Sequence, residues 1–207
     1  MSKIIGLVGF IGSGKGTAGD ILQNLGFEKE SFAKGVKDAA AAMFGWDRSL
    51  LEGDTEESRK FREEPDLFWS NRFGRDFTPR EALQKMGTEV GRDIFHNDFW
   101  VLQLENRIKT HNKPIVITDV RFPNEIDWIH KQGGDVIEIQ RGTPPNWYKL
   151  LKSTLPERDV DYRWGIMNDY DVHYSEWAWV GCKTNAVIKN NGTLEDLTDV
   201  MKFVIIS

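Results

Sequence analysis

The run Gly9-Phe-Ile-Gly-Ser-Gly-Lys-Gly-Thr17 restricts the fold of this chain more than any other feature of its sequence. An apolar stretch over residues 3–8 precedes the run, and a segment with helical periodicity follows it over residues 16–25. A glycine-rich loop between a strand and a helix is the structural context of a phosphate-binding P-loop. The glycines let backbone N–H groups turn inward, and the helix N-terminus adds its partial positive charge. The sequence therefore predicts a phosphate site at this loop.

Six residues of the loop are predicted to bind the phosphates of ATP: Gly12, Ser13, Gly14, Lys15, Gly16 and Thr17. Lys15 can reach the β- and γ-phosphates as a mobile point charge, so it is also a candidate catalytic residue. Usually Ser or Thr follows this Lys directly, whereas here Gly16 intervenes before Thr17. The Gly-Lys-Gly-Thr ending resembles that of nucleoside monophosphate kinases, and the resemblance implies that the Thr17 hydroxyl serves a Mg²⁺ ion. The alternative is a glycine-rich turn with a surface lysine, which the fit of the whole run disfavours.

Charge and cysteine content narrow the possible functions. A net charge of −5 provides no excess of positive charge to neutralise phosphates, which argues against stable nucleic-acid or membrane-surface binding. Cys182 is the only cysteine, so an intrachain disulfide and a multi-cysteine zinc site are excluded. No apolar run approaches membrane-spanning length, and the first predicted strand lies at the N-terminus, leaving no room for a signal peptide. We therefore expect a cytoplasmic protein.

Strand and helix patterns alternate along the chain. Four short apolar segments have the character of buried parallel strands, and a weaker fifth lies near Glu30–Ala33. The four are Lys3–Val8, Pro114–Thr118, Asp135–Gln140 and Asn185–Lys189. Helices are predicted over Gly16–Leu25, Gly35–Phe44, Pro79–Ile94, Asp98–Thr110, Asn124–Gln132 and Leu194–Ile205. In the last helix, which Thr193 caps, one face is predicted to cover the sheet: Leu194, Leu197, Val200, Met201, Val204 and Ile205.

This alternation predicts an α/β fold, the three-layer P-loop NTPase fold around a parallel sheet of about five strands. Two long stretches fit the scheme poorly: 45–77, which is charged and aromatic, and 142–183, which is rich in Trp. Long insertions in a compact domain are usually functional. Nucleoside monophosphate kinases insert an acceptor-binding region and a lid at these two places. We therefore expect one domain over 1–207, with core segments 1–44, 78–141 and 184–207, an acceptor-binding insertion at 45–77 and a lid at 142–183.

The helix predicted over Pro79–Ile94 has two stripes. Thr78 as N-cap and Pro79 at the first position make a strong helix start. One stripe is apolar (Leu83, Met86, Val90 and Ile94) and the other polar (Arg80, Gln84, Thr88 and Arg92). Guanidinium, amide and hydroxyl groups suit a nucleoside monophosphate, so the polar stripe is predicted to bind the substrate. The alternative is a solvated helix face, which the interior glycines Gly87 and Gly91 make less favourable.

Charged residues follow two of the predicted strands. Asp119 stands at the carboxyl end of a strand beside the P-loop, where a carboxylate can hold hydrated Mg²⁺, although a helix cap is the alternative. Arg121 is predicted to face the transferred phosphoryl group and to be both catalytic and substrate-binding. Arg141 closes the fourth strand and is predicted to clamp donor phosphates, as Arg158 or Arg163 in the lid could. The stretch His173–Glu176 lacks a hydrolase motif and is interpreted as packing or capping.

Together these motifs resemble the deoxynucleoside monophosphate kinases of tailed bacteriophages. The matching stretches are the P-loop, 31–33 with Lys37, 42–46, 51–55, 78–84 with 87–89, 119–125, His173 with 175–176, and 191–194. Animal phosphomevalonate kinases are more distantly similar, and that resemblance places Arg92 and Arg121 at acceptor-phosphate positions. The lid resembles the family least.

The resemblance implies transfer of the ATP γ-phosphoryl group to a deoxynucleoside monophosphate, giving the diphosphate, with Mg²⁺ as the metal and the host cytoplasm as the location. Other P-loop kinases, acting on phosphomevalonate or dephospho-coenzyme A, are alternatives. A nucleic-acid-coupled ATPase is disfavoured by the acidic charge and by the missing Glu after Asp119. A regulatory module without turnover is disfavoured by Arg121 and the two insertions. Which bases are accepted, and whether the chain forms a homodimer, are left open.

Overall fold

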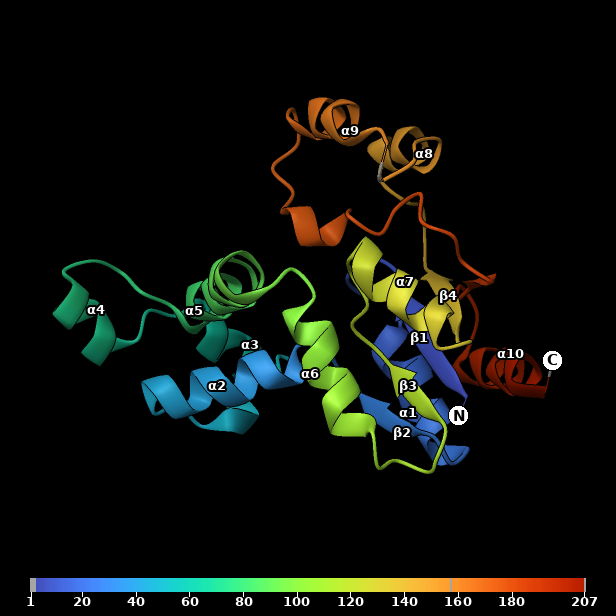
Figure 1. Ribbon diagram of the computed structural model, residues 1–207, viewed down its shortest axis with the longest axis horizontal. Helices are drawn as coiled ribbons and strands as arrows, with labels where there is room; N and C mark the ends of the chain where they lie inside the picture. Colours follow the sequence, from blue (N-terminus) through green and yellow to red (C-terminus); the bar gives the residue numbers. More distant parts are fainter. Residues whose placement is uncertain (1–2, 157, 207) are drawn as a thin grey trace. The chain divides into compact units, whose positions relative to one another are not determined.

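A parallel β-sheet organises the first of two compact units in the computed structural model, which describes residues 3–156 and 158–206 (Figure 1). Within those residues the sheet has five strands in the order β2-β3-β1-β4-β5. All neighbouring strands are parallel. The strands are β1 (Ile4–Val8), β2 (Glu28–Glu30), β3 (Ile115–Ile117), β4 (Asp135–Gln140) and β5 (Ala186–Lys189).

Helices cover both faces of this sheet. Successive side chains of a strand point to opposite faces, so Ile5 and Leu7 of β1 share one face. They pack with α1 (Lys15–Asn24) and α10 (Leu194–Ile206) in one apolar core. On the other face a Cβ atom at Gly6 would lie 2.5 Å from Ile129 of α7 (Pro123–Lys131). The three-layer α/β fold predicted from the sequence is therefore confirmed (Figure 1).

Between β4 and β5 the chain forms α8 (Asn146–Lys152), α9 (Val160–Met167) and the short 3₁₀ turn η3 (Tyr174–Glu176). These elements belong to the first unit, which comprises the chain up to Ser31 and from Thr110 onward. No helix in the described residues is both long enough and apolar enough to span a membrane.

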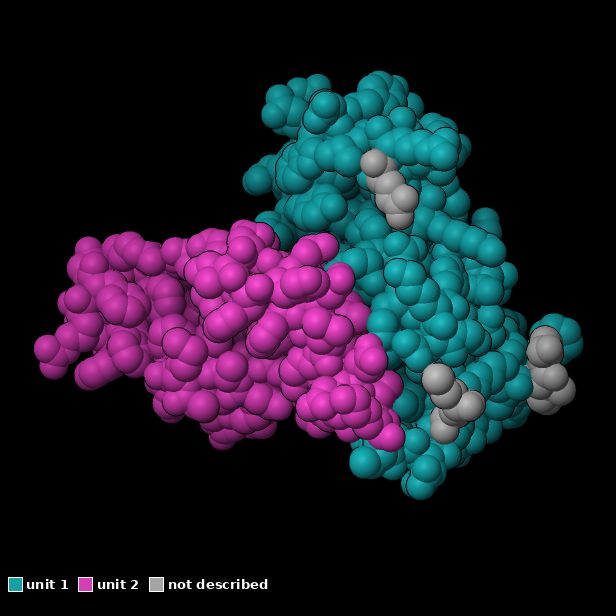
Figure 2. Space-filling view, viewed as in Figure 1, with its two compact units in different colours: residues 1–31, 110–207 teal, residues 32–109 magenta. Residues whose placement is uncertain are grey.

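Residues 32–109 form the second compact unit, which is helical (Figure 2). Its elements are α2 (Lys34–Phe44), η1 (Arg48–Leu51), α3 (Glu56–Glu63), α4 (Leu67–Phe73), α5 (Pro79–Lys85), η2 (Met86–Phe95) and α6 (Phe99–Ile108). Its core is rich in aromatic side chains and includes Trp46, Phe77 and Trp100. The unit therefore has an apolar core of its own, separate from that beneath the sheet.

One predicted strand lies elsewhere, and one predicted helix face is only partly buried. The fifth strand was expected near Glu30–Ala33, but β2 spans Glu28–Glu30, because Glu28 and Glu30 pair with Ile115 and Ile117 of β3. In α10 the predicted face is only partly buried. Leu197 and Met201 pack against the core, whereas Leu194 and Val200 are exposed because the helix turns them away from the sheet.

The helix predicted over Pro79–Ile94 changes character at its midpoint. It is α-helical only to Lys85 and continues as the π-helix η2, in which each N–H bonds five residues back instead of four. A Cβ atom at Gly91 would lie 2.3 Å from the Trp100 indole nitrogen, which donates to the Gly87 carbonyl at 2.8 Å. Gly91 is therefore required for the packing of Trp100.

The wider π turn also breaks the predicted apolar stripe. Met86 is buried and Leu83 packs against the same core. Val90 and Ile94, which an α-helix would bring to that face, are exposed. A four-residue spacing does not follow one face through a helix whose bonds span five residues.

Candidate active site

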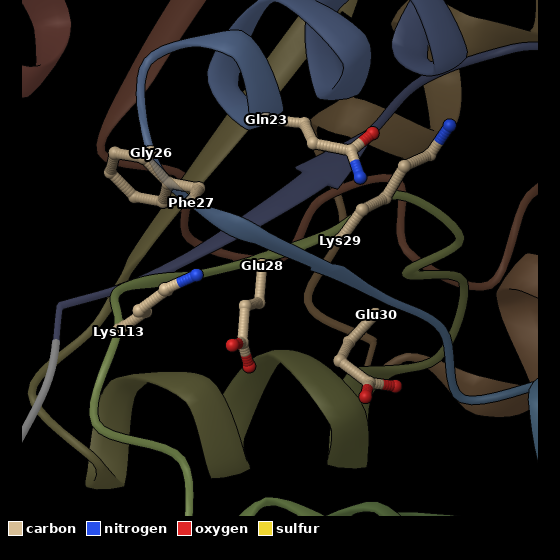
Figure 3. Close-up of a pocket in the computed structure, with 7 residues that line it drawn as sticks. All are labelled: Gln23, Gly26, Phe27, Glu28, Lys29, Glu30 and Lys113. Carbon is tan, nitrogen blue, oxygen red and sulfur yellow. The ribbon is translucent and has the colours of Figure 1, made fainter.

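A surface cavity of about 410 Å³ lies at the C-terminal end of α1, whereas the P-loop lies at its N-terminal end (Figure 3). It is lined by Gln23, Gly26, Phe27, Glu28, Lys29, Glu30 and Lys113. None of these is a predicted site residue, and Lys29 is paired with Asp20 across 2.6 Å. The candidate site is therefore built from the P-loop.

Three glycines give the P-loop its shape. Gly9, Gly12 and Gly14 have φ angles of 146°, 77° and 99°, a region that side chains disfavour. A Cβ atom at Gly9 would also lie 2.3 Å from the Ile139 carbonyl oxygen. The Asn190 amide donates to the Ser13 carbonyl at 2.9 Å, which ties the loop to the end of β5. The loop is therefore curled and braced without a ligand.

The remaining loop residues leave room for an anion. A Cβ atom built at Gly12 or at Gly16 would meet no atom within 4 Å. Thr17 is exposed in the first turn of α1. The Ser13 hydroxyl is buried and finds no hydrogen-bond partner among the described residues. Buried hydroxyls are normally paired, so the Ser13 hydroxyl has unused hydrogen-bonding capacity within the loop.

Lys15 lies within the curl of the loop. Its ammonium group donates to the carbonyl oxygens of Gly9 and Phe10 at 2.7 and 2.8 Å. Burial and the nearby Arg121 lower the Lys15 pKa to about 8, while Glu176 and Asp119 partly oppose this. The lysine thus remains mainly protonated at pH 7, in a place where its charge is poorly solvated.

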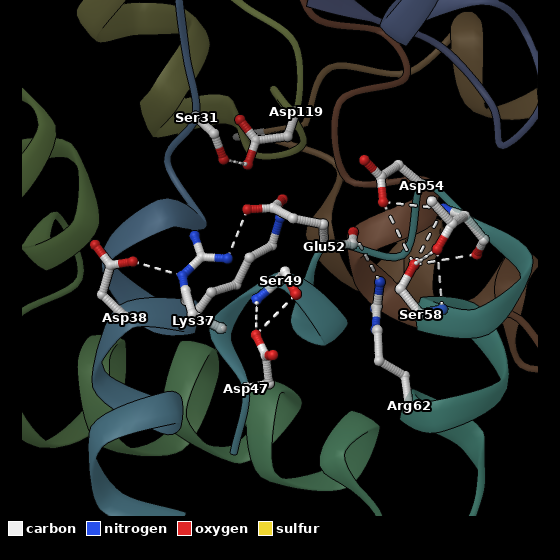
Figure 4. Close-up of polar contacts among 12 residues, drawn as sticks. Ser31, Lys37, Asp38, Asp47, Ser49, Glu52, Asp54, Ser58, Arg62 and Asp119 are labelled. Carbon is white, nitrogen blue, oxygen red and sulfur yellow. Dashed lines mark hydrogen bonds and ion pairs between the residues drawn. The ribbon is translucent and has the colours of Figure 1, made fainter. Parts of the chain in front are cut away.

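The strand end after β3 supplies Asp119 and Arg121. The Asp119 carboxylate accepts a hydrogen bond from the Ser31 hydroxyl at 2.7 Å (Figure 4). The Arg121 backbone N–H donates to the Glu125 carboxylate at 2.8 Å, which fixes the turn into α7. The Arg121 guanidinium contacts the carboxylate of Glu176. Of the predicted site residues, Lys15, Asp119 and Arg121 therefore lie near one another in the structure. Glu176, which was not predicted, lies with them.

Segment 142–183 packs on the P-loop through aromatic rings. Phe10 lies against Trp147, Tyr148 and Trp179 at ring-centroid distances of 5.3 to 5.5 Å. Beneath α8 the buried Glu138 carboxylate contacts the Tyr148 hydroxyl and accepts from Lys152 at 2.8 Å and from Gln140 at 2.6 Å. The start of this segment is thus anchored to β4.

The three candidate arginines in or next to this segment differ in how far their side chains are buried. Arg163 is 2% exposed, and its guanidinium donates to the Thr154 hydroxyl and to the carbonyls of Leu151, Trp177, Ala178 and Val180. Burial lowers the Arg163 pKa. With its donors occupied by the protein, Arg163 stabilises the segment from within. Arg158 is exposed, and Arg141 is exposed directly after β4.

The polar stripe lies in the second unit. Thr78 caps α5 as predicted, accepting from the Glu81 N–H at 3.1 Å. Arg80 and Gln84 are exposed on α5, and Arg80 pairs with Glu63. Thr88 and Arg92 are half-buried in η2, where Arg92 donates to the Asn97 carbonyl at 3.1 Å. Two of the four residues of the predicted polar stripe, Thr88 and Arg92, therefore lie in the π-helical segment.

The same unit contains an ion-pair network between α2 and η1 (Figure 4). Glu52 accepts from Lys37 at 2.6 Å and from Arg48 at 2.5 Å, and Arg48 also pairs with Asp38 at 2.5 Å. All four side chains are partly exposed, and such pairs stabilise a surface only modestly. Their role is to fix η1 against α2.

Comparison with known proteins decides the family. No family model matches the chain. A protein of Acanthamoeba polyphaga mimivirus, provisionally named a deoxynucleotide monophosphate kinase, is 33% identical over 207 residues, covering 93% of this chain and 91% of the relative. This chain belongs to the deoxynucleotide monophosphate kinase family. The deoxynucleoside-5'-monophosphate kinase of Escherichia phage T5 is 49% identical over 49 residues, which are 23% of this chain and 20% of the phage enzyme.

Solved structures show more distant likenesses to this kinase. Shikimate kinase from Bacteroides thetaiotaomicron aligns over 99% of both chains with a TM-score of 0.47 and 11% identity. Dephospho-CoA kinase from Campylobacter jejuni covers 99% of this chain and is itself covered to 96%, with a TM-score of 0.37 and 18% identity. Likenesses of this size say nothing about the reaction.

The chemistry of the kinase's loop suits the phosphates of ATP, since it has open space at Gly12 and Gly16, a Ser13 hydroxyl without a partner and the Lys15 ammonium. No cluster of three or more metal-ligating side chains occurs in the described residues. Mg²⁺ in phosphoryl-transfer sites is usually held by one or two protein oxygens and the substrate phosphates. The oxygens of Asp119 and Thr17 match that chemistry.

Sequence reasoning missed three supporting residues of the kinase. Glu176 pairs with Arg121, Glu125 binds the Arg121 backbone, and Asn190 braces the loop. Residues 173–176 were expected to cap or pack, and His173 does cap η3 by accepting from the Ser175 N–H at 3.3 Å. The contacts of Asn190 and Glu176 join residues far apart in the sequence, so no local pattern revealed them. Glu125 lies four residues after Arg121, at the third position of α7, where a glutamate commonly binds backbone N–H groups before the helix.

Proposed function

We propose that this kinase transfers the γ-phosphoryl group of ATP to a deoxynucleoside 5'-monophosphate, giving ADP and the deoxynucleoside diphosphate. The observation that carries the proposal is the charge arrangement at the P-loop, where Lys15 and Arg121 lie among Asp119 and Glu176. Family membership, supported by a relative that covers nearly the whole chain, points to the same acceptor.

Phosphoryl transfer through a loose transition state needs positioning and charge neutralisation more than covalent chemistry. The P-loop N–H groups, the Ser13 hydroxyl and the Lys15 ammonium bind the donor phosphates. Arg121, at the carboxyl end of β3, neutralises charge on the transferred group, and Arg141 after β4 adds a donor contact. Asp119 and Thr17 would hold Mg²⁺, which when bound neutralises phosphate charge.

We assign the acceptor to Arg80, Gln84, Thr88 and Arg92, together with Arg121. Guanidinium groups pair with phosphate oxygens, and an amide such as Gln84 both donates to and accepts from a base edge. π-helical turns often occur at functional sites, which supports a binding role for η2.

The proposed acceptor is a deoxynucleotide, with more than one base tolerated. Phe68 and Phe73 of α4 are exposed, whereas Trp69 packs on Phe44. An aromatic ring can stack on any base, and strong rejection of a base requires buried polar groups matched to its edge. The proposed partners are small molecules alone, in the cytoplasm of a host cell.

Water must be kept from the activated phosphoryl group if transfer is to exceed hydrolysis. The rings of Trp147, Tyr148 and Trp179 cover Phe10 of the P-loop. We therefore propose that segment 142–183 shields the donor site as a lid.

Arg92→Ala and Arg121→Ala are expected to reduce kcat/KM for the acceptor by about 10- to 100-fold, because each removes a charge-assisted phosphate contact of about 1.5–3 kcal/mol. In Arg92→Ala the KM for ATP should stay unchanged. Steady-state kinetics with dGMP and dTMP measure both effects. Lys109→Ala, an exposed lysine at the end of α6 and outside segment 45–77, is the control and should match the wild type. Acceptor kinetics unchanged in both variants would rule out this acceptor site.

A further inference from the structure

Glu176 lies where segment 142–183 meets the end of β3. Its carboxylate contacts the Arg121 guanidinium, and the neighbouring Ser175 hydroxyl accepts from the same Nη1 atom at 3.4 Å. The side chains of Arg121 and Glu176 are 39% and 23% exposed, so the pair is partly open to solvent. The contact joins residues that are far apart in the sequence.

The backbone that carries Glu176 is firmly supported. The four residues after it, Trp177 to Val180, are at most 3% exposed. The Trp179 indole donates to the Glu176 carbonyl at 3.1 Å, and the Arg163 guanidinium binds three of the carbonyls that follow. A carboxylate on such a support can fix the position of a partner side chain.

The residues that precede Glu176, and the backbone of Arg121, are also held by hydrogen bonds. His173 Nδ1 lies 2.9 Å from the Ser175 hydroxyl oxygen, which orients that acceptor. The Arg121 backbone is held by the Glu125 carboxylate. Both ends of the Arg121 residue are therefore restrained, the backbone by α7 and the guanidinium by η3.

We propose that Glu176 is a positioning residue, which holds the Arg121 guanidinium at the P-loop so that its remaining N–H groups face the phosphoryl group. The inference rests on the proposed function. A guanidinium has five N–H donors in a planar fork, and Glu176 and Ser175 both engage Nη1. The other donors are left for phosphate oxygens, and their direction is set by the ion pair.

Glu176→Gln is the first test, because it removes the charge at nearly constant size. We expect kcat/KM with the best deoxynucleotide to fall about 10- to 100-fold, since a small misplacement of a catalytic group can cost that much. Asp171→Asn removes one exposed charge from the same segment and should change kcat/KM by less than about twofold. In an Arg121→Ala background Glu176→Gln should add nothing further, because the two residues act through one contact.

Glu176→Asp separates position from charge. It keeps the negative charge but shortens the side chain, which moves the carboxylate away from the Arg121 guanidinium, so kcat/KM should still fall. If Glu176 instead merely occupied Arg121 until phosphate displaced it, Glu176→Gln would bind the acceptor more tightly and lose no rate. That result, or full additivity with Arg121→Ala in folded protein, would overturn the proposal.

A measurement that does not depend on turnover separates this inference from the proposed function. The ¹⁵Nε–Hε NMR signal of Arg121, assigned by its loss in Arg121→Ala, reports how firmly the guanidinium is held. In Glu176→Gln this signal should shift and its proton should exchange faster with water than in the wild type and Asp171→Asn, because the contact to Nη1 is weakened. A wild type that phosphorylates no deoxynucleotide would refute the proposed function, and an Arg121 signal unchanged by Glu176→Gln would refute the placement of Glu176 even then.

Discussion

Lys15→Met is expected to abolish phosphoryl transfer and to make the protein more stable. Loss of one preorganised charge contact in a transition state typically costs about 10²–10³-fold in kcat, and Lys15 is proposed to contact the transferred group itself. Turnover should fall by at least that factor. The fold should persist, because the Gly9 and Phe10 carbonyls are the only backbone acceptors that Lys15 occupies in the described structure.

The gain in stability follows from the lowered Lys15 pKa. Between pH 8 and 10.5 the unfolded chain binds more protons at this residue than the folded chain does, so stability from this source rises with pH. Below pH 8 the folded protein carries the full cost of a poorly solvated charge, about 3 kcal/mol. At pH 7 the free energy of unfolding of Lys15→Met should exceed that of the wild type by about 1–3 kcal/mol, since two lost hydrogen bonds offset part of the gain.

Urea unfolding at pH 7 and pH 10 measures this difference, which should be smaller at pH 10. Lys131→Met, an exposed lysine of α7, is the control and should change stability by about 0.5 kcal/mol or less. A folded Lys15→Met variant that keeps wild-type turnover would refute the role of the lysine. A variant less stable than the wild type at pH 7 would refute the account of its charge.

Arg163→Leu is expected to destabilise the protein by about 3–5 kcal/mol. The guanidinium is buried and serves four carbonyl oxygens and one hydroxyl, and each acceptor left without a partner costs about 1–3 kcal/mol, partly relieved by local rearrangement. The loss should be concentrated in segment 142–183. Hydrogen exchange of its amides, measured with the unfolding free energy, would locate it.

Arg158→Leu is the matched control, because Arg158 is an exposed arginine of the same segment. Its unfolding free energy should stay within about 0.5 kcal/mol of the wild-type value. Equal effects of the two substitutions would show that Arg163 does not hold the segment together.

Local patterns accounted for most of the fold. The P-loop, the strands β1, β3, β4 and β5 and the N-cap of α5 at Thr78 depend on residues adjacent in sequence, and all lie within a residue or so of where the sequence placed them. β2 was misplaced because it is a charged three-residue strand, Glu-Lys-Glu, whose only signal is pairing with β3. Periodicity alone does not locate such a strand.

The remaining differences arise from contacts between distant residues. The π turn of η2 accommodates Trp100, whose ring packs on Gly91. The periodicity of the first residues of this helix does not distinguish an α-helix from a π-helix. Arg163 looked like any lid arginine, and only the folded segment shows that carbonyls surround it. The pairing of Glu176 with Arg121 likewise joins residues 55 positions apart. The sequence thus indicates candidate site residues more readily than the contacts that position them.

The most direct measurement is product analysis of the purified wild-type protein with ATP, Mg²⁺ and one acceptor at a time. The acceptors are dGMP, dTMP, dCMP, dAMP, their ribose counterparts, phosphomevalonate and dephospho-coenzyme A. We expect ADP and the deoxynucleoside diphosphate in equal amounts with more than one base, a lower kcat/KM for ribonucleotides, and little ATP hydrolysis without an acceptor. ATP hydrolysis with no phosphorylated acceptor, or transfer only to phosphomevalonate or dephospho-coenzyme A, would contradict the proposed function.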